Sequence, residues 1–140
     1  MEDQQPDKTI VKLREWSREI NRGFLEFWVL SLLRRESLYG ARISDLMEDL
    51  TDGRIQLEPG TIYPLLRRLA SSGWIVSDIR VRSGGRGPMR RYYRLTKEGK
   101  QLHSRMVEHY LGSFEELLKM MMADFSSVRE RLIQLMKEIE

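Results

Sequence analysis

The sequence lacks cysteine and contains only two histidines among its 140 residues. The lack of cysteine excludes disulfide bonds and cysteine-ligated zinc, and it is typical of proteins in a reducing compartment. His103 and His109 are six residues apart, so one helix would present them on different faces, and we expect no metal site. The sequence also lacks a phosphate-cradling glycine loop followed by Lys and Ser or Thr, and a cluster of histidine with carboxylates. We therefore expect neither an enzyme nor a bound cofactor.

Long hydrophobic runs are missing as well. The longest run, Phe24 to Leu33, includes Glu26 and Ser31 and covers about ten residues, whereas a membrane-spanning helix needs roughly 20. The run lies behind charged residues, unlike the apolar segment of a secretory signal. We expect no membrane contact and a cytoplasmic location. The length and the 41% hydrophobic content allow one domain, or one domain with a helical extension.

Charge is concentrated in one segment, although the formal net charge is only +3. From Ile79 to Lys97 there are seven basic side chains and no acidic one. Salt screens exposed charges beyond about 8 Å, so this local concentration matters more than the total. An unopposed basic hairpin favours contact with nucleic-acid phosphates.

The spacing of apolar residues predicts the order of the elements. Gly23 is expected to end or kink the first helix, and a strand remains the alternative for residues 24–35. Pro64 suits the first turn of a helix, so we start the third helix near Thr61. In the hairpin, we expect one inner face with Ile75, Ser77, Ile79 and Val81, joined by Tyr92 and Leu95. We expect helices at 8–21, 24–35, 39–50, 61–73, 97–125 and 128–139, and strands at 55–57, 74–82 and 89–95.

A helix pair followed by a β-ribbon is a winged helix-turn-helix. We therefore predict a mainly α fold with a small β-ribbon, flanked by N- and C-terminal dimerisation helices. The expected domains are an N-terminal extension at 1–22, helical from about residue 8, a DNA-binding winged helix-turn-helix at 23–95, and a C-terminal dimerisation region at 96–140. Uncovered apolar stripes usually bind a partner, here a second copy. The stripe that we assign to the homodimer comprises Leu102, Met106, Tyr110, Phe114, Leu117, Met121 and Phe125.

Three segments resemble PadR-type transcriptional regulators: Gly60 to Leu69, Ser72 to Ile75 and Arg91 to Gly99. The resemblance covers roughly Phe24 to Gly99. It implies a winged-helix repressor that dimerises through its C-terminal helices and often responds to small hydrophobic or aromatic molecules. One position departs from the pattern. The family often has His-Gly-Tyr at the start of the second helix, whereas this chain has Tyr39-Gly40-Ala41.

The expected partner is a palindromic double-stranded DNA operator. The helix from Thr61 would enter a groove and the basic hairpin would follow the backbone. Tyr63 and Pro64 could instead be structural, and Arg67 and Arg68 could be ordinary solvated residues. Alternation along the returning strand lets only one of its two adjacent arginines face the DNA. The predicted DNA-binding residues are Thr61, Tyr63, Pro64, Arg67, Arg68, Arg80, Arg82, Arg86, Arg90 and Arg91.

Three functional assignments remain to be given. Tyr110 and Phe114 are candidates for an effector pocket, because effector-binding members of the family hold flat ligands between aromatic side chains at the dimer centre. Met120 to Met122 could form an adaptable ligand pocket or part of the dimer core. The alternative function is a protein–protein interaction module whose basic wing docks an acidic partner.

Overall fold

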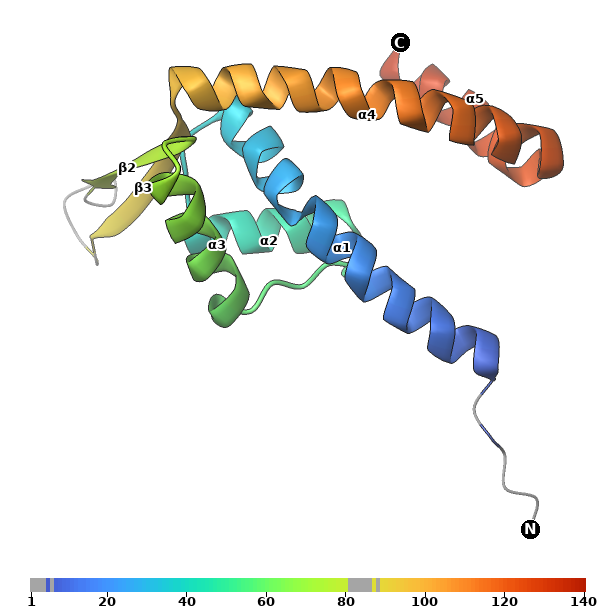
Figure 1. The fold of residues 1–140 in the computed structure, drawn as a ribbon, viewed down its shortest axis with the longest axis horizontal. Coiled ribbons are helices and arrows are strands. Elements are labelled where there is room, and N and C mark those ends of the chain that lie inside the picture. The colour runs from blue at the N-terminus through green and yellow to red at the C-terminus, as the bar shows by residue number, and fades with distance from the viewer. Residues whose placement is uncertain (1–4, 6, 81–86, 88) are drawn as a thin grey trace. The chain divides into compact units, whose positions relative to one another are not determined.

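The computed structural model describes residues 5, 7–80, 87 and 89–140 (Figure 1). The chain divides into two compact units, with the boundary between His103 and Ser104. The fold is mainly helical with one small antiparallel sheet, as predicted for a winged helix. The elements are α1 (Lys8–Arg35), β1 (Leu38–Tyr39), α2 (Gly40–Leu50), α3 (Pro59–Ser71), β2 (Ile75–Arg80), β3 (Arg90–Leu95), α4 (Lys97–Asp124) and α5 (Ser126–Ile139).

Helix α1 is continuous from Lys8 to Arg35, so the predicted break at Gly23 and the strand alternative are both wrong. The carboxylate of Asp7 caps the helix by accepting a hydrogen bond from the Thr9 amide at 2.9 Å. A glycine inside a helix costs only about 1 kcal/mol relative to alanine. Burying one leucine contributes about 1.5–3 kcal/mol. The helix therefore continues, and it buries Leu25, Val29, Leu30, Leu32 and Leu33.

Helices α2 and α3 pack their apolar faces into the same core. Helix α3 begins at Pro59, two residues earlier than predicted, and Pro64 lies inside it rather than in its first turn. Pro59 takes the first helical position, where the missing amide costs nothing. Burial of Ile62 before Pro64 and of Leu65 and Leu66 after it keeps the helix intact. The buried residues of the two helices include Ile43, Met47, Ile62, Leu65, Leu66 and Leu69.

The sheet has the strand order β1-β3-β2. Its third strand is Leu38–Tyr39, which pairs with Tyr92 and Tyr93 of β3, and the strand predicted at 55–57 is absent. The Ile55 amide donates instead to the Thr51 hydroxyl at 3.0 Å, next to the end of α2. Ile55 is also buried. The apolar spacing at 55–57 therefore reflects packing of a connecting segment rather than strand pairing.

The faces of the hairpin differ from the prediction in two places. Ile75, Tyr93 and Leu95 are buried, but Ile79 is 54% exposed. Tyr92 lies on the face of β3 opposite to Leu95, and its ring meets the edge of Tyr39 at 5.4 Å. A strand alternates its side chains, so two residues three apart cannot share a face. Ile79 shares a strand face with Ile75, but it lies in the distal half of the ribbon and is exposed there.

The start of α4 is fixed against the hairpin by Thr96 and Gly99. The Thr96 hydroxyl accepts from the Gly99 amide at 3.0 Å and donates to the Gly73 carbonyl oxygen at 2.6 Å, so Thr96 caps the helix. A Cβ on Gly99 would overlap the Trp74 carbonyl oxygen. Only glycine fits where the helix meets β2.

A hydrogen-bonded chain joins α1 to the second turn of α4. Arg34 lies 3.0 Å from Nδ1 of His103 and donates to the Lys100 carbonyl oxygen at 3.2 Å. Since Arg34 can only donate, Nδ1 accepts, and Nε2 carries the proton toward the Ser31 hydroxyl at 2.8 Å. Ser31 in turn donates to the Phe27 carbonyl oxygen at 2.7 Å. This arrangement requires a neutral imidazole.

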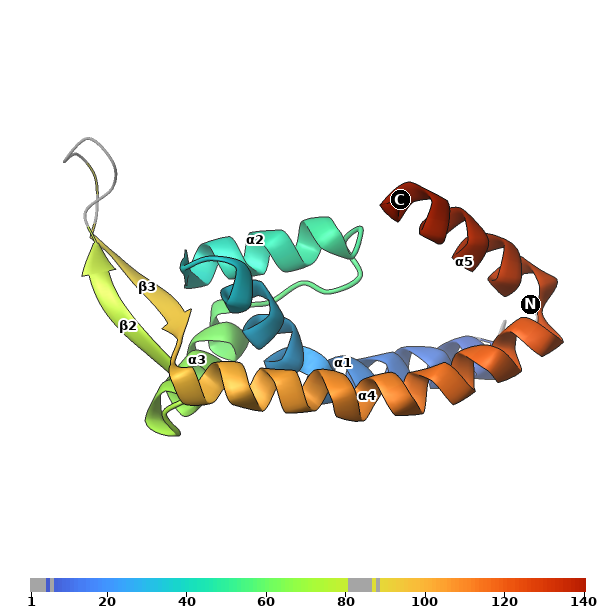
Figure 2. The ribbon, with the colours of Figure 1, turned by 90° about the horizontal axis from the view of Figure 1, so that it is seen from above.

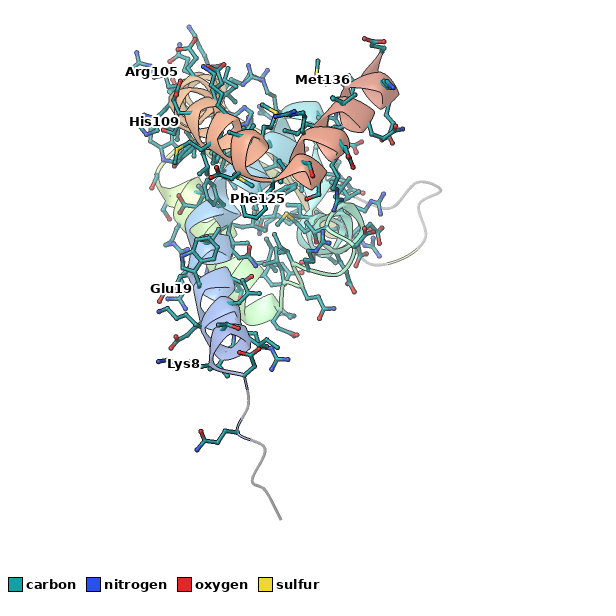
Figure 3. The ribbon with its side chains drawn as sticks, turned by 90° about the vertical axis from the view of Figure 1, so that its right-hand side faces the viewer. Lys8, Glu19, Arg105, His109, Phe125 and Met136 are labelled. Carbon is teal, nitrogen blue, oxygen red and sulfur yellow. The ribbon has the colours of Figure 1, made fainter. Side chains whose placement is uncertain are left out.

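The second unit contains the rest of α4 and all of α5 (Figure 2). Phe125 separates the two helices in an extended conformation (Figure 3), whereas the helices predicted at 97–125 and 128–139 left the break at Ser126 and Ser127. Helix α5 has no buried residue. Among the described residues, no helix is both long enough and apolar enough to cross a bilayer.

We predict that the fold loses stability as the pH falls below 6.5, the ordinary pKa of a histidine side chain. Burial, and secondarily the Arg34 guanidinium, lower the pKa of His103 from its ordinary value of 6.5. The unfolded chain therefore binds the proton more readily than the folded chain, and stability falls as the pH drops below 6.5. Thermal unfolding should show a smaller pH dependence in His103→Gln than in the wild type. His109→Gln is the matched control, and a wild-type pH dependence in His103→Gln would contradict the assignment.

Candidate nucleic-acid interface

The outer face of α3 and the sheet enclose a hollow. Burial of the apolar face of α3 leaves Tyr63, Arg67 and Ala70 on the side that faces the ribbon. With Ser77 of β2 and two residues of β3, they line a hollow of about 400 Å³. The β3 residues are Arg91 and Tyr93. Side chains from α3 and from the ribbon formed by β2 and β3 therefore meet at one surface.

Tyr63 also forms part of a second hollow. This space of about 290 Å³ lies where α2 begins, and Tyr63 is 40% exposed between the two hollows. A Cβ on Gly40 would lie 2.7 Å from Cε1 of Tyr63. The aromatic ring therefore rests directly on the glycine that opens α2. The hollow is lined by Tyr39, Gly40, Ala41, Tyr63, Met89, Arg90, Arg91 and Tyr93.

The two hollows are basic. Arg67, Arg90 and Arg91 line them, and none of the described lining residues carries a carboxylate. Burial raises the pKa of the Tyr93 phenol, and Tyr63 adds to this, while Arg91 and Arg67 act in the opposite direction. The phenol is therefore neutral at pH 7 and adds no negative charge beside the arginines. Such a concave cationic surface attracts phosphates.

Arg90 and Arg91 contact different side chains, yet alternation does not keep either of them out of the second hollow. Arg91 donates to the Ser77 hydroxyl at 3.0 Å, in the hollow shared with α3. Arg90 stacks over the Tyr39 ring, 4.2 Å from its centre. Both line the hollow at the start of α2, so Arg90 is not excluded from the interface.

Arg80 is partly neutralised. It forms an ion pair with Asp78 at 3.0 Å and lies 4.9 Å from the centre of the Tyr92 ring. Both charged side chains remain about half exposed, so the pair is a weak one. A phosphate could still draw the guanidinium away from the carboxylate. Arg80 is nevertheless a weaker candidate than Arg67 or Arg91.

The remaining predicted residues do not join the two hollows. Arg68 is exposed and Pro64 is half-buried, but neither lines them. Thr61, in the first turn of α3, lines a separate groove beside α1. Arg82 and Arg86 lie outside the described residues. The described part of the candidate interface therefore centres on Tyr63, Arg67 and Arg91.

The sequence interpretation missed three residues of this surface. Tyr39 supports Arg90, Gly40 supports Tyr63, and Ser77 holds Arg91. Their roles depend on the pairing of β1 with β3 and of Ser77 with Tyr93. A two-residue strand has no periodicity, so only the apolar Leu38-Tyr39 pair before α2 could have suggested it.

In the second unit, Tyr110 and Phe114 stack with their ring centres 6.0 Å apart and their planes at 26°. His109 meets the edge of Tyr110 at 5.2 Å. Figure 3 shows Arg105 and His109, one helical turn apart, projecting from the same side of α4. The predicted effector residues are therefore in contact with each other.

Comparison with known proteins identifies the family. Residues 29–105 match the family described as "Transcriptional regulator PadR-like family". The chain belongs to the PadR-like family. It is 30% identical over 105 residues to an uncharacterised protein X of Lysinibacillus sphaericus, covering 74% of this chain and 93% of that one. It is also 32% identical over 83 residues to a transcriptional regulator of Mycobacterium tuberculosis, covering 59% of this chain and 72% of that one.

Solved structures give the same result. A PadR family transcriptional regulator from Eggerthella lenta is 30% identical, with a TM-score of 0.63 and coverage of 82% of this chain and 93% of that one. A transcriptional regulator from Clostridium thermocellum is 28% identical, with a TM-score of 0.62 and coverage of 72% and 96%. This PadR-like protein is therefore a transcriptional regulator with a DNA-binding winged-helix fold. The family match begins at residue 29, within α1.

We predict that Gly40→Ala weakens DNA binding more than it weakens the fold. The added Cβ would displace the Tyr63 ring, which can swing outward because it is partly exposed. The fold should lose at most about 1 kcal/mol, the low end for overpacking. Affinity for a random duplex at low salt should fall several-fold in fluorescence anisotropy.

A double-mutant cycle isolates this effect. Once Tyr63→Ala has removed the ring, Gly40→Ala should cost no further affinity, because the two substitutions act through one contact. Additive losses in the double variant would show that Gly40 does not act through Tyr63.

Proposed function

We propose that the protein is a homodimeric repressor that binds a palindromic double-stranded DNA operator. The single observation that carries the proposal is the hollow in which Tyr63 and Arg67 of α3 meet Arg91 of β3. Helix-turn-helix proteins place the second helix of the pair in the major groove, with its N-terminal residues on base edges. The ribbon beside it then follows the backbone.

The side chains divide into two roles under this proposal. Thr61, Tyr63, Pro64, Arg67 and Arg68 belong to the helix that enters the groove. Arg67 is suited either to a paired hydrogen bond with guanine or to a phosphate. The ribbon arginines position the protein on phosphates, which carry little sequence information. The backbone contacts are Arg80, Arg82, Arg86, Arg90 and Arg91.

The dimer rests on the apolar surface of the second unit. Leu117 and Phe125 are 50% and 59% exposed, and Met121 is also exposed. A second copy would cover this surface, together with Leu102, Met106, Tyr110 and Phe114. Two-fold symmetry then predicts two half-sites separated by whole helical turns, roughly 34–36 Å each. A dimer held on such an operator would block transcription.

A small hydrophobic or aromatic effector would release the repressor. The stacked rings of Tyr110 and Phe114 would offer a flat molecule an aromatic surface at the proposed dimer centre. Such a ligand shifts the protein away from DNA only if it binds the DNA-free state more tightly.

Arg67→Ala and Arg91→Ala should differ in how they change DNA binding. Arg67→Ala should relax discrimination at particular base pairs by about 1–3 kcal/mol. Arg91→Ala should weaken binding to all DNA sequences alike. The dependence of affinity on salt should decrease by the amount expected for the loss of about one phosphate contact per protomer. The measurement is selection of an operator from random duplexes, followed by anisotropy at several salt concentrations.

Lys137→Ala, an exposed cation of α5, is the control. Unchanged binding in both arginine variants would contradict the interface. An acidic protein that binds the wild type and is not displaced by DNA would favour an interaction module instead.

Leu117→Glu should convert the dimer into a monomer, because it places a charge in the apolar surface between copies. Light scattering should then give half the wild-type mass. Ala123→Glu adds the same charge on a different, exposed face of α4 and should leave the mass unchanged. A wild-type mass equal to one subunit would refute the homodimer.

A further inference from the structure

A second basic groove lies between α1 and the segment that joins α2 to α3. It encloses about 460 Å³. Arg18 and Arg22 of α1 line one side, Arg54 of the connecting segment lines the other, and Thr61 lies at the end formed by α3. The apolar part of the lining comes from Leu25, Ile55 and Leu57. All of these residues belong to the first unit.

The arginines of this groove lie without an acidic neighbour in its described lining. None of the described residues that line the groove is an aspartate or glutamate. Within the described part of the chain, Arg18, Arg22 and Arg54 take part in none of the ion pairs or side-chain hydrogen bonds. Lys12 of the same helix, in contrast, pairs with Glu15 at 3.7 Å. Three cations that converge without a carboxylate form a site for an anion.

The position of the groove indicates which kind of anion binds there. Thr61 belongs to the first turn of α3, the part of a reading helix that lies deepest in the major groove. Phosphates border that groove on both sides, and the groove is about 12 Å wide. An anion beside Thr61 is therefore a backbone phosphate when α3 reads DNA. Guanidinium groups hold phosphates through paired hydrogen bonds.

We propose that Arg18, Arg22 and Arg54 bind the DNA backbone next to α3. This inference rests on the proposed function, because it requires α3 to occupy the major groove. It gives the part of α1 that precedes the family match a role in DNA binding. The ribbon and α1 then grip the backbone on opposite sides of the reading helix.

The test compares Arg18→Ala/Arg22→Ala with the wild type on a selected operator duplex. The double variant should bind the operator about tenfold more weakly near 0.15 M salt. The dependence of its affinity on salt should decrease by the amount expected for the loss of about two phosphate contacts per bound protomer. Arg18→Lys/Arg22→Lys keeps the charge and should recover most of the salt dependence. Circular dichroism checks that helix content is retained.

Lys12→Ala/Arg35→Ala is the matched control. It removes the same charge from α1 at exposed positions outside the groove, and it should change affinity less than about twofold. The proposal would be overturned if Arg18→Ala/Arg22→Ala lost no more affinity for the operator than this control loses. A loss of affinity with an unchanged salt dependence would also overturn it.

The outcomes separate this proposal from the proposed function. If the wild type binds duplex and Arg67→Ala weakens it while Arg18→Ala/Arg22→Ala does not, only the groove assignment fails. If the wild type binds no duplex at any salt concentration, both proposals fail.

Discussion

Burial of one face of α3 decides which side chains this helix can offer to a partner. Ile62, Leu65, Leu66 and Leu69 are each no more than 4% exposed. Rotating the helix would expose several of these side chains, each worth about 1.5–3 kcal/mol of burial. The opposite face, with Tyr63 and Arg67, is thereby held outward. The position of the interface is a consequence of core packing.

The sheet brings the second half of the interface to that face. Tyr93, at the centre of the three strands, is buried between the ribbon and the helical core, and its neighbour Arg91 reaches Ser77 beside α3. Two glycines make this arrangement possible through their lack of a side chain. Gly40 leaves room for the Tyr63 ring, and Gly99 lets α4 start against the Trp74 carbonyl oxygen. The surface and the start of α4 are thus fixed by the same core.

Much of this could be predicted from the sequence, because helical periodicity and turn residues are local signals. These local signals predicted the helix pair and the hairpin, and the family motifs around Tyr63 and Tyr92 could be read directly from the sequence. The continuous α1 could not be predicted, since the packing that overrides Gly23 is tertiary. The pairing of β1 with β3 joins residues more than fifty positions apart, and no local pattern encodes it. The arginines of α1 and of the α2–α3 connection converge only in the folded chain.

The central claim is that the N-terminal turn of α3 lies in the major groove. Because the sequence has no cysteine, Gly60→Cys would carry a unique thiol, and a Cβ at this position meets no atom within 4 Å. A hydroxyl-radical-generating iron chelate attached there would cut bound DNA near the helix. Cleavage should map to two symmetry-related patches on the major-groove side of the operator. Cuts spread evenly along the duplex, or confined to the minor-groove side, would contradict this account.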